Sequence, residues 1–468
     1  MSDNVFRDVE LPEGRRDVVM RGGIVADITA PGTAAGATII DGRGGALLPG
    51  LHDHHLHLHA MAAAADSVRC GPPDVTDLDA LESALVAAQG DWIRGVGYTE
   101  TVGGLLDRAA VDLIVPDRPV RIQHRSGALW ILNSPASELV GLDRGTHPGI
   151  ERDANGIPTG RLWRADDWLR AHLPHSPPPD LRAVGQQLTR SGITGVTDAT
   201  PDLSSATLDA LVTAHRTGAV PQRLQLLGVG IDDTASFDDT ASFDDTITVG
   251  PYKIVIADSA LPDFEDLADT ILRAHACHRP VAVHCVSRVA LALLLAVFDD
   301  VGVLAGDRIE HGSIIGADAI ADLAARGLRV VTQPGFVADR GDDYLRRVDA
   351  GDLPDLYRCR SLLAGGVHTA MSSDAPYGPL DPWVVIAAAV QRRAPTGEIV
   401  SAGERVTAAE ALDGYLAPLD DPGGPPRRVQ VGADADLVLL DRPLADALAA
   451  PAAQRVRCTV IAGQVLVE

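Results

Sequence analysis

The segment Leu48-Pro49-Gly50-Leu51-His52-Asp53-His54-His55-Leu56-His57-Leu58-His59 places five histidines within eight positions. Side chains alternate between the two faces of a strand, so histidines two positions apart share a face and can hold one metal ion between them. Two registers satisfy this rule, His52 with His54 and His55 with His57. Neutral imidazole is a common zinc ligand, so the segment predicts a metal site on an early strand, the alternative being a solvated polar turn.

Downstream of this segment, short apolar stretches alternate with Ala- and Leu-rich helical stretches, which is the pattern of βα units around a parallel sheet. We expect strands at residues 195–198, 223–227, 252–256, 280–284, 308–311, 329–332 and 368–372. With residues 47–51 they number about eight, which predicts an α/β protein built on a closed (β/α)₈ TIM barrel. The active site of such a barrel lies at the C-terminal ends of its strands.

The two chain ends have a different pattern, with β-branched runs separated by glycine turns, which is typical of small antiparallel strands. We expect residues 1–48 and 416–468 to form one small β-sandwich domain and residues 49–415 to form the barrel. Residues from about 58 to 190 are too many for a βα loop, which predicts an inserted subdomain after the first strand. An acidic hexapeptide repeated at 232–243 predicts a solvated loop.

Composition excludes several classes of function. The 468 residues include 40 Lys and Arg against 64 Asp and Glu, a net charge of −24, which argues against a nucleic-acid partner. The longest apolar run, residues 289–298, is about half of the ~20 residues that a membrane span needs, and no secretory signal is visible at the start. Five scattered cysteines indicate reduced thiols. These features favour a cytoplasmic enzyme with a small-molecule substrate, and a homodimer is the default assembly.

Residues 49–57, spaced as Pro-Gly-x-x-Asp-x-His-x-His, resemble the first-strand signature of the metal-dependent amidohydrolase superfamily. The resemblance selects the His55/His57 register and leaves the other three histidines of the segment without a ligand role. Within the superfamily the chain is similar to the branch of YtcJ-like and N-substituted formamide deformylase proteins, also called amidohydrolase 3 type. Residues 153–160, 191–198, 308–311 and 433–441 carry that similarity. Residues 124–128 depart from the branch pattern, so its substrate contacts cannot be transferred there.

Lys253 is the only lysine in the chain, beside 39 arginines, since 40 − 1 = 39. A guanidinium does not deprotonate in proteins, whereas a desolvated lysine amine can be neutral and can add CO₂ to form a carbamate. In binuclear members of the superfamily a carboxylated lysine bridges two cations. The resemblance therefore implies that role for Lys253, the alternative being a chance survivor of codon drift.

Two single histidines and one aspartate follow Lys253 in the order that the resemblance implies. His284 and His311 end predicted strands, and Asp374 follows the last one. Each alone is weak evidence, because a lone histidine is commonly a core residue and Ser-Asp-Ala-Pro is commonly a turn. Together they complete a metal ligand set of six residues: His55, His57, Lys253, His284, His311 and Asp374.

The resemblance implies a hydrolase of carbon–nitrogen bonds other than peptide bonds, with two divalent cations, zinc being the expected metal. A metal-bridging hydroxide would attack an amide, formamide or cyclic amide, and Asp374 would be the catalytic proton shuttle. For substrate binding we expect contacts from five residues: Gln333, Tyr377, Tyr98, Trp130 and Trp163. The last three could instead form the core of the insertion.

Two alternatives keep the same fold. One is a mononuclear metal-dependent deaminase, in which Lys253 is structural and Glu310 is a candidate general acid. The other is a catalytically silent binding protein. Metal content separates the first alternative from the binuclear enzyme, and an intact ligand set argues against the second.

Overall fold

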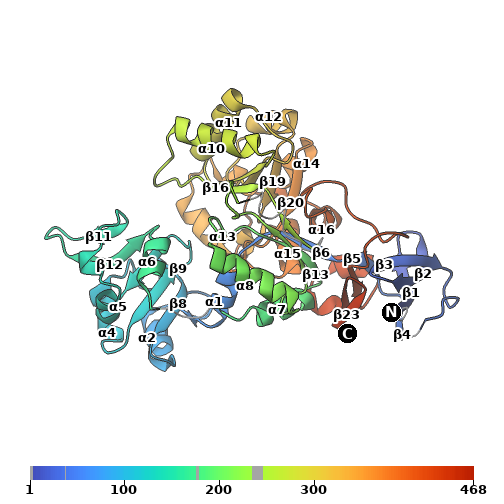
Figure 1. The fold of residues 1–468 in the computed structure, drawn as a ribbon, viewed down its shortest axis with the longest axis horizontal. Coiled ribbons are helices and arrows are strands. Elements are labelled where there is room, and N and C mark those ends of the chain that lie inside the picture. The colour runs from blue at the N-terminus through green and yellow to red at the C-terminus, as the bar shows by residue number, and fades with distance from the viewer. Residues whose placement is uncertain (1–3, 37, 175–178, 234–245, 468) are drawn as a thin grey trace. The chain divides into compact units, whose positions relative to one another are not determined.

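A computed structural model describes residues 4–36, 38–174, 179–233 and 246–467 (Figure 1). The chain forms two compact units, one made of Met1–Leu58 with Leu181–Glu468 and the other of His59–Asp180. Most of the acidic repeat, residues 234–243, lies outside the described residues. Helices and strands are mixed along both units, so the fold is of the α/β type.

The first unit contains two parallel sheets. One has the order β15-β14-β13-β6, and the other has the order β16-β17-β18-β19-β20. Their strands are β6 (Leu51–Leu56), β13 (Ile193–Asp198), β14 (Arg223–Leu226), β15 (Ile247–Val249), β16 (Tyr252–Val255), β17 (Val281–Cys285), β18 (Arg308–His311), β19 (Arg329–Thr332) and β20 (His368–Met371). Seven of these strands overlap the expected segments between 195 and 372.

Backbone hydrogen bonds connect the two parallel sheets at both edges. Asp374 N, just after β20, donates to His55 O in β6 at 2.8 Å. At the other edge Lys253 N in β16 donates to Leu227 O, just after β14, at 3.2 Å. The ends of β6 and β20 therefore lie next to each other, and β16 begins beside the end of β14.

The first strand of the parallel sheets differs from the expected segment 47–51. Residues Leu47–Pro49 form β5, which pairs with β21 (Leu437–Leu440) in a different sheet, and the parallel strand β6 begins at Leu51. Gly50 separates the two strands. A Cβ at Gly50 would lie 2.1 Å from the Thr194 side chain, so only glycine allows β6 to approach β13 so closely.

Helices follow the parallel strands and bury their apolar faces against them. In α11 (Arg288–Val301), Leu291, Leu294 and Phe298 are spaced for one helix face and pack with Val283 of β17 in a shared core. The other helices of this unit are α7 (Arg182–Arg190), α8 (Ser205–Arg216), α10 (Phe264–Ala276), α12 (Ala319–Arg326), α13 (Gly335–Arg347), α14 (Arg360–Ala364), α15 (Pro382–Gln391), α16 (Ala408–Leu416) and α17 (Leu444–Ala449). Short 3₁₀ turns are η2 (Leu353–Asp355), η3 (Ala402–Glu404) and η4 (Ala453–Arg455).

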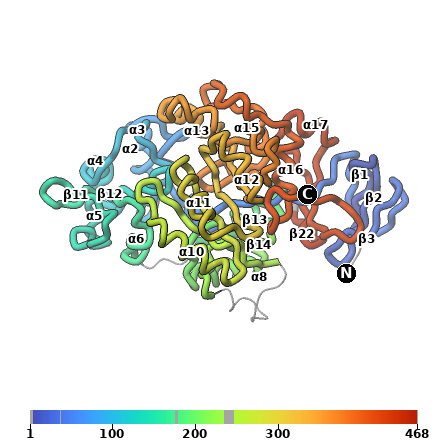
Figure 2. Tube along the Cα trace, turned by 90° about the horizontal axis from the view of Figure 1, so that it is seen from above, coloured from blue at the N-terminus to red at the C-terminus, as the bar shows by residue number. Residues whose placement is uncertain are grey.

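The two chain ends lie side by side in both views (Figures 1 and 2). The N-terminal strands are β1 (Asn4–Leu11), β2 (Gly14–Arg21), β3 (Ile24–Thr29) and β4 (Thr38–Asp41), in the order β3-β2-β1-β4. The second sheet has the order β23-β22-β21-β5, with β22 (Val456–Ile461) and β23 (Gln464–Val467). Phe6 and Val18 of the first sheet share one apolar cluster with Leu439 and Val460 of the second, so the two ends stabilise one another.

The second unit is built on one six-stranded sheet with the order β11-β12-β10-β9-β8-β7. Its strands are β7 (Val68–Arg69), β8 (Ile93–Tyr98), β9 (Val120–His124), β10 (Leu129–Leu132), β11 (Ile150–Arg152) and β12 (Pro158–Trp163). Its helices are α2 (Leu78–Ala87), α3 (Glu100–Gly103), α4 (Arg108–Ile114), α5 (Ser134–Leu139), η1 (Leu142–Arg144) and α6 (Asp166–His172), and α1 (Leu58–Ala65) leads into it. No helix within the described ranges has the length and hydrophobicity needed to cross a bilayer.

Candidate metal centre

His55, His57 and Asp374 form a compact group of metal-ligating side chains. One ligand atom from each lies within 4.8 Å of the others. Asp374 Oδ1 is 3.2 Å from His57 Nε2 and 3.6 Å from His55 Nε2. The side chains that β6 directs toward Asp374 are therefore those of His55 and His57, and not those of His52 and His54.

The histidines of the other register have different surroundings. His52 Nδ1 lies 3.0 Å from the carbonyl oxygen of Ala417. His54 is fully buried, and burial lowers its pKa to about 3. Neither belongs to the group around Asp374.

Asp53 fixes the two strand ends that carry this group. Its carboxylate accepts hydrogen bonds from the backbone N–H of His55 at 3.1 Å and of Ser373 at 3.2 Å. Asp374 itself has φ +53°, a left-handed conformation that aspartate tolerates better than most residues. Burial raises the pKa of Asp53 to about 7. The Asp53 contacts therefore couple the position of Asp374 to that of His55.

His284 and His311 lie beside the same group, at the ends of β17 and β18. The ring centroid of His311 is 4.7 Å from that of His55 and 4.5 Å from that of His284. His311 has φ +71°, which breaks the strand alternation at the end of β18. Burial holds the pKa of both His55 and His311 well below the usual histidine range, so both rings are neutral at physiological pH, as metal ligation requires.

Lys253 projects from β16 and is only 4% exposed. Burial lowers its pKa to about 8, although the nearby carboxylates Glu310 and Asp374 act in the opposite direction. Among the described residues, no hydrogen-bond acceptor is found for its Nζ. A buried amine with this pKa is partly neutral near physiological pH, which is the form that adds CO₂.

Three histidines direct their Nδ1 atoms toward hydrogen-bond partners outside the group. His55 Nδ1–H donates to the Glu310 carboxylate in a very short contact. His57 Nδ1 is 3.1 Å from the Thr200 hydroxyl, and His311 Nδ1–H donates to the Gln333 amide oxygen at 2.8 Å. Partners of this kind select the tautomer with a lone pair on Nε2, the atom that then binds metal.

The donor set fits a divalent cation. Within the described part of the chain, His55 Nε2, Asp374 Oδ1 and Lys253 Nζ are buried side-chain atoms without a hydrogen-bond partner. A buried polar atom left unsatisfied costs about 1–3 kcal/mol, so several of them at one point indicate a ligand. Imidazole nitrogen and carboxylate oxygen are the ligands of catalytic zinc.

The residues expected to bind substrate fall into two sets. Tyr377 lies beside the centre, with its ring 5.5 Å from that of His57. Gln333 is fully buried, and its amide group donates to Ser372 Oγ at 2.9 Å while accepting from His311. A direct contact between Gln333 and substrate stays a prediction.

The three aromatic candidates lie in the second unit. Tyr98 is buried and its hydroxyl donates to Gly104 O at 2.7 Å. Trp130 is also buried and its indole N–H donates to Asp166 at 2.7 Å. Trp163 is 40% exposed, so it has surface to offer a ligand. Their contacts with substrate also stay predictions.

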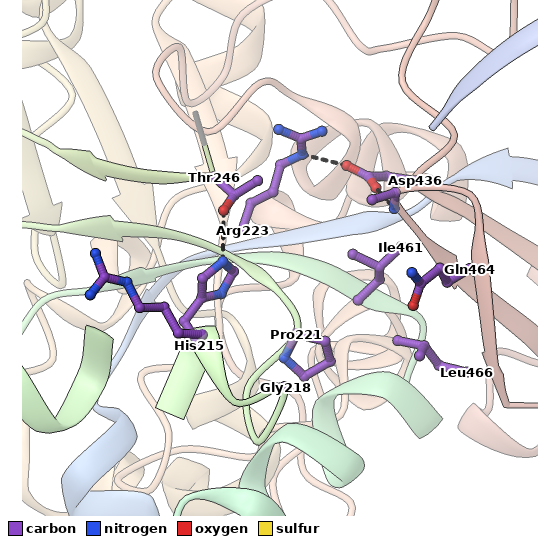
Figure 3. A pocket seen from close by; sticks show the side chains of 11 residues that line it. His215, Gly218, Pro221, Arg223, Thr246, Asp436, Ile461, Gln464 and Leu466 are labelled. Atoms are coloured by element: carbon purple, nitrogen blue, oxygen red, sulfur yellow. Dashed lines mark hydrogen bonds and ion pairs between the residues drawn. The ribbon is translucent and has the colours of Figure 1, made fainter. Parts of the chain in front are cut away.

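A separate hollow lies between α8 and the C-terminal strands (Figure 3). Its polar side chains already pair with one another, His215 with the Thr246 hydroxyl at 2.6 Å and Arg223 with Asp436 at 2.5 Å (Figure 3). None of the six ligand candidates lines it. The hollow is therefore not part of the centre.

Sequence reasoning gave Glu310 and Gln333 other roles, general acid and substrate contact, and it missed Thr200 as a partner of a candidate ligand. Thr200 follows β13 and gave no signal, because isolated threonines at strand ends are common. Glu310 precedes His311, and strict strand alternation would put the two on opposite faces. Only the positive φ of His311 lets both side chains face the centre. Cys285, in contrast, is buried in an apolar cluster and its thiol pKa is raised by burial, in line with a packing role.

The chain resembles several known proteins over almost its full length. The model of the amidohydrolase family matches residues 38–467. N-substituted formamide deformylase of Arthrobacter pascens is 27% identical, with 91% of this chain and 90% of that protein covered. The YtcJ protein of Bacillus subtilis (strain 168) is 26% identical, with 91% of this chain and 89% of that protein covered.

Solved structures show the same fold. An uncharacterized metal-dependent hydrolase from Pyrococcus horikoshii OT3 has a TM-score of 0.75 at 20% identity, covering 94% of this chain and 98% of that one. A similar hydrolase from Pyrococcus furiosus has a TM-score of 0.71 at 22% identity, covering 94% and 99%. The predicted branch is thus confirmed: the chain belongs to the amidohydrolase family and is a hydrolase of carbon–nitrogen bonds.

Proposed function

We propose that this enzyme is a binuclear metal-dependent hydrolase that cleaves the C–N bond of an amide, formamide or cyclic amide. The observation that carries the proposal is the group of His55, His57 and Asp374, with the buried Lys253 in electrostatic contact with His55 and Asp374. The formamide deformylase relative, similar over 91% of this chain, supports this substrate class.

The fold proposed for this activity is one closed (β/α)₈ barrel. The hydrogen bonds between the two parallel sheets at both edges support closure. Five of the six ligand candidates lie near or just after the C-terminal ends of barrel strands, where barrel enzymes have their active sites, and Lys253 lies on β16 itself. We further propose that the chain ends form a β-sandwich and that residues of about 58–190 are an insertion.

Two divalent cations, zinc in our proposal, would be held by this ligand set. His55 and His57 would hold one with Asp374, and His284 and His311 would hold the other. Lys253, carboxylated by CO₂, would bridge them. When bound, such cations lower the pKa of a coordinated water to about 7 and polarise a substrate carbonyl.

The chain's own contribution to the reaction is proton transfer by Asp374. Its Oδ1 faces His57 Nε2 and His55 Nε2, at the point where the substrate carbonyl would be attacked. Asp374 accepts a proton from the attacking water as the C–O bond forms and passes it to the leaving nitrogen as the C–N bond breaks. The Asp53 contacts with His55 and Ser373 hold this carboxylate in place.

Several further properties are proposed with this function. Tyr377 is the substrate contact that the geometry favours, because its ring packs beside His57. Trp163 is the candidate from the second unit that combines exposure with a large apolar surface. We propose a cytoplasmic enzyme that acts on a small molecule, with a homodimer as the default assembly.

One observation bears on the mononuclear deaminase, the second candidate. The three-residue group by itself can hold one ion. That candidate would use Glu310 as general acid, but both Glu310 oxygens contact other side chains, Arg308 and His55. A carboxylate held between two donors is a poor proton donor, which favours the binuclear enzyme.

Metal content tests the proposal. Protein produced with ample zinc should contain about two ions per chain by elemental analysis. His57→Asn should lose at least one of them, whereas His215→Asn, which removes a histidine outside the centre, should retain both. A reproducible value near one in the wild type would favour the deaminase, and a value near zero would reject both candidates.

A panel of formamides, N-acyl amino acids, cyclic imides and lactones then tests the substrate class. Release of amine or ammonia from a C–N substrate supports the proposal. Hydrolysis of lactones alone contradicts the assigned bond.

A further inference from the structure

A buried pair of charged residues lies behind the first-strand histidine. Arg308 and Glu310 are two positions apart on β18, so their side chains share one face of the strand. Arg308 is 1% exposed and Glu310 is fully buried. Arg308 Nε donates to Glu310 Oε1 at 2.6 Å.

The other carboxylate oxygen of Glu310 contacts His55, one of the six candidate metal ligands. Glu310 Oε2 accepts from His55 Nδ1–H in a very short hydrogen bond. The opposite ring nitrogen, His55 Nε2, faces Asp374 Oδ1 at 3.6 Å. The three side chains therefore form a continuous chain of contacts, from Arg308 through Glu310 to the metal-binding face of His55.

We propose that Glu310 is a positioning residue that fixes the ring orientation and tautomer of His55 for metal binding, and that Arg308 holds Glu310 in that role. The inference rests on the proposed function, because it assumes that His55 binds a cation.

The physical reason is the proton on Nδ1. A carboxylate only accepts hydrogen bonds when ionised, so it forces the proton of His55 onto Nδ1 and leaves the lone pair on Nε2. It also makes the imidazole a stronger ligand. Arg308 is needed because an ionised carboxylate without a partner would be strongly disfavoured at this depth.

The backbone conformation of His311 allows this arrangement. His311 follows Glu310 and would point to the opposite face of a regular strand. Its φ of +71° redirects the ring toward His55 and His284, so one strand end supplies both a metal ligand and the residue that positions another ligand.

The test is Glu310→Gln, with zinc affinity of the metal-free protein measured by competition with a chromophoric chelator. We expect zinc binding to weaken about 10–100-fold, the usual effect of removing a carboxylate behind a metal-bound histidine. The Co²⁺-substituted protein should also show an altered visible absorption spectrum, a readout that needs no substrate.

Glu404→Gln is the matched control. Glu404 is also buried and accepts from an arginine, Arg358 Nη1, at 2.8 Å, but its remaining hydrogen bonds go to Ser361. This variant should lose a comparable amount of thermal stability while its zinc affinity stays within about two-fold of the wild type.

A double variant covers the case in which Glu310→Gln does not fold, because a lone Arg308 charge would remain buried. Arg308→Met with Glu310→Gln removes both charges, which commonly restores stability. If the double variant folds but binds zinc weakly, the positioning role stands. Wild-type zinc affinity in either variant would overturn it, and a wild type without zinc would instead reject the proposed function.

Discussion

Lys253→Met should have opposite effects on the metal-free and the metal-loaded protein. In the structure the lysine amine is buried without a hydrogen-bond acceptor among the described residues. Burial lowers its pKa from the ordinary value of 10.5 to about 8. Each tenfold change in a protonation equilibrium corresponds to about 1.4 kcal/mol, so burying the ammonium costs the folded protein about 3 kcal/mol at neutral pH. Methionine has a similar shape and no charge, and should recover most of this free energy.

The sign of the pH dependence follows from linkage. Between about pH 8 and 10.5 the unfolded state binds more protons than the folded state, so wild-type stability rises with pH in this window. The free-energy cost of burying the Lys253 ammonium is fully present below pH 8 and vanishes above pH 10.5. The advantage of Lys253→Met should therefore be largest at pH 7 and should shrink at alkaline pH.

The assay is denaturant unfolding of chelator-treated protein in bicarbonate-free buffer at several pH values. Arg279→Met is a matched control, because Arg279 is also a buried cation but donates to the carbonyls of Val229, Leu227 and Gly250. Removing it should destabilise the protein. A Lys253→Met protein that is no more stable than the metal-free wild type at pH 7, or whose advantage does not change up to pH 10, would refute this reasoning. With zinc and bicarbonate the order should reverse, since the variant loses the bridge.

Three further predictions test the centre. Asp374→Asn can still coordinate weakly but cannot take a proton, so kcat on an identified substrate should fall about 10²–10⁴-fold at unchanged thermal stability, and activity within a few-fold of wild type would contradict the shuttle role. Lys253→Arg keeps a charge but cannot form a carbamate, so elemental analysis should show one ion lost per chain. The metal content of Lys253→Ala should be partly restored by small carboxylic acids. Two ions per chain in the arginine variant would exclude the bridge. Thr200→Val removes the Nδ1 partner of His57 and should weaken zinc binding about 10-fold by chelator competition. Thr197→Val, which removes a buried hydroxyl that contacts Gln225 instead of a histidine, should not.

The sequence alone located most of the parallel strands, because buried strands read as short apolar runs between turn residues. It misplaced the first strand. Residues Leu47–Pro49 are as apolar as a parallel strand but pair with the C-terminal sheet. The parallel strand is the histidine-rich segment itself, β6. The alternation of histidines placed the metal site on a strand, but hydrophobicity alone put the strand boundary too early, at residues 47–51.

The grouping of His55, His57 and Asp374 could be anticipated from the resemblance, whereas the residues that orient them could not. Hydrogen-bond partners such as Thr200 and Gln333 come from strands far apart in sequence, and no periodic pattern marks them. Glu310 was visible in the sequence, but its direction depends on the backbone at His311. Contacts that depend on one backbone angle lie beyond what residue spacing can predict.

Features that disfavour the metal-free fold are concentrated at the centre. Lys253 is buried without a partner, and His311 and Asp374 both have positive φ, which costs of order 1–3 kcal/mol for each such residue when it is strained. His311 holds its position because its ring donates to Gln333, and Asp374 holds its position because its backbone N–H donates to His55 O while the neighbouring Ser373 N–H donates to Asp53. A cation that binds here would satisfy the unpartnered atoms without moving the backbone. Metal binding should therefore add stability with little structural change, which distinguishes a preformed centre from one that folds around its metal.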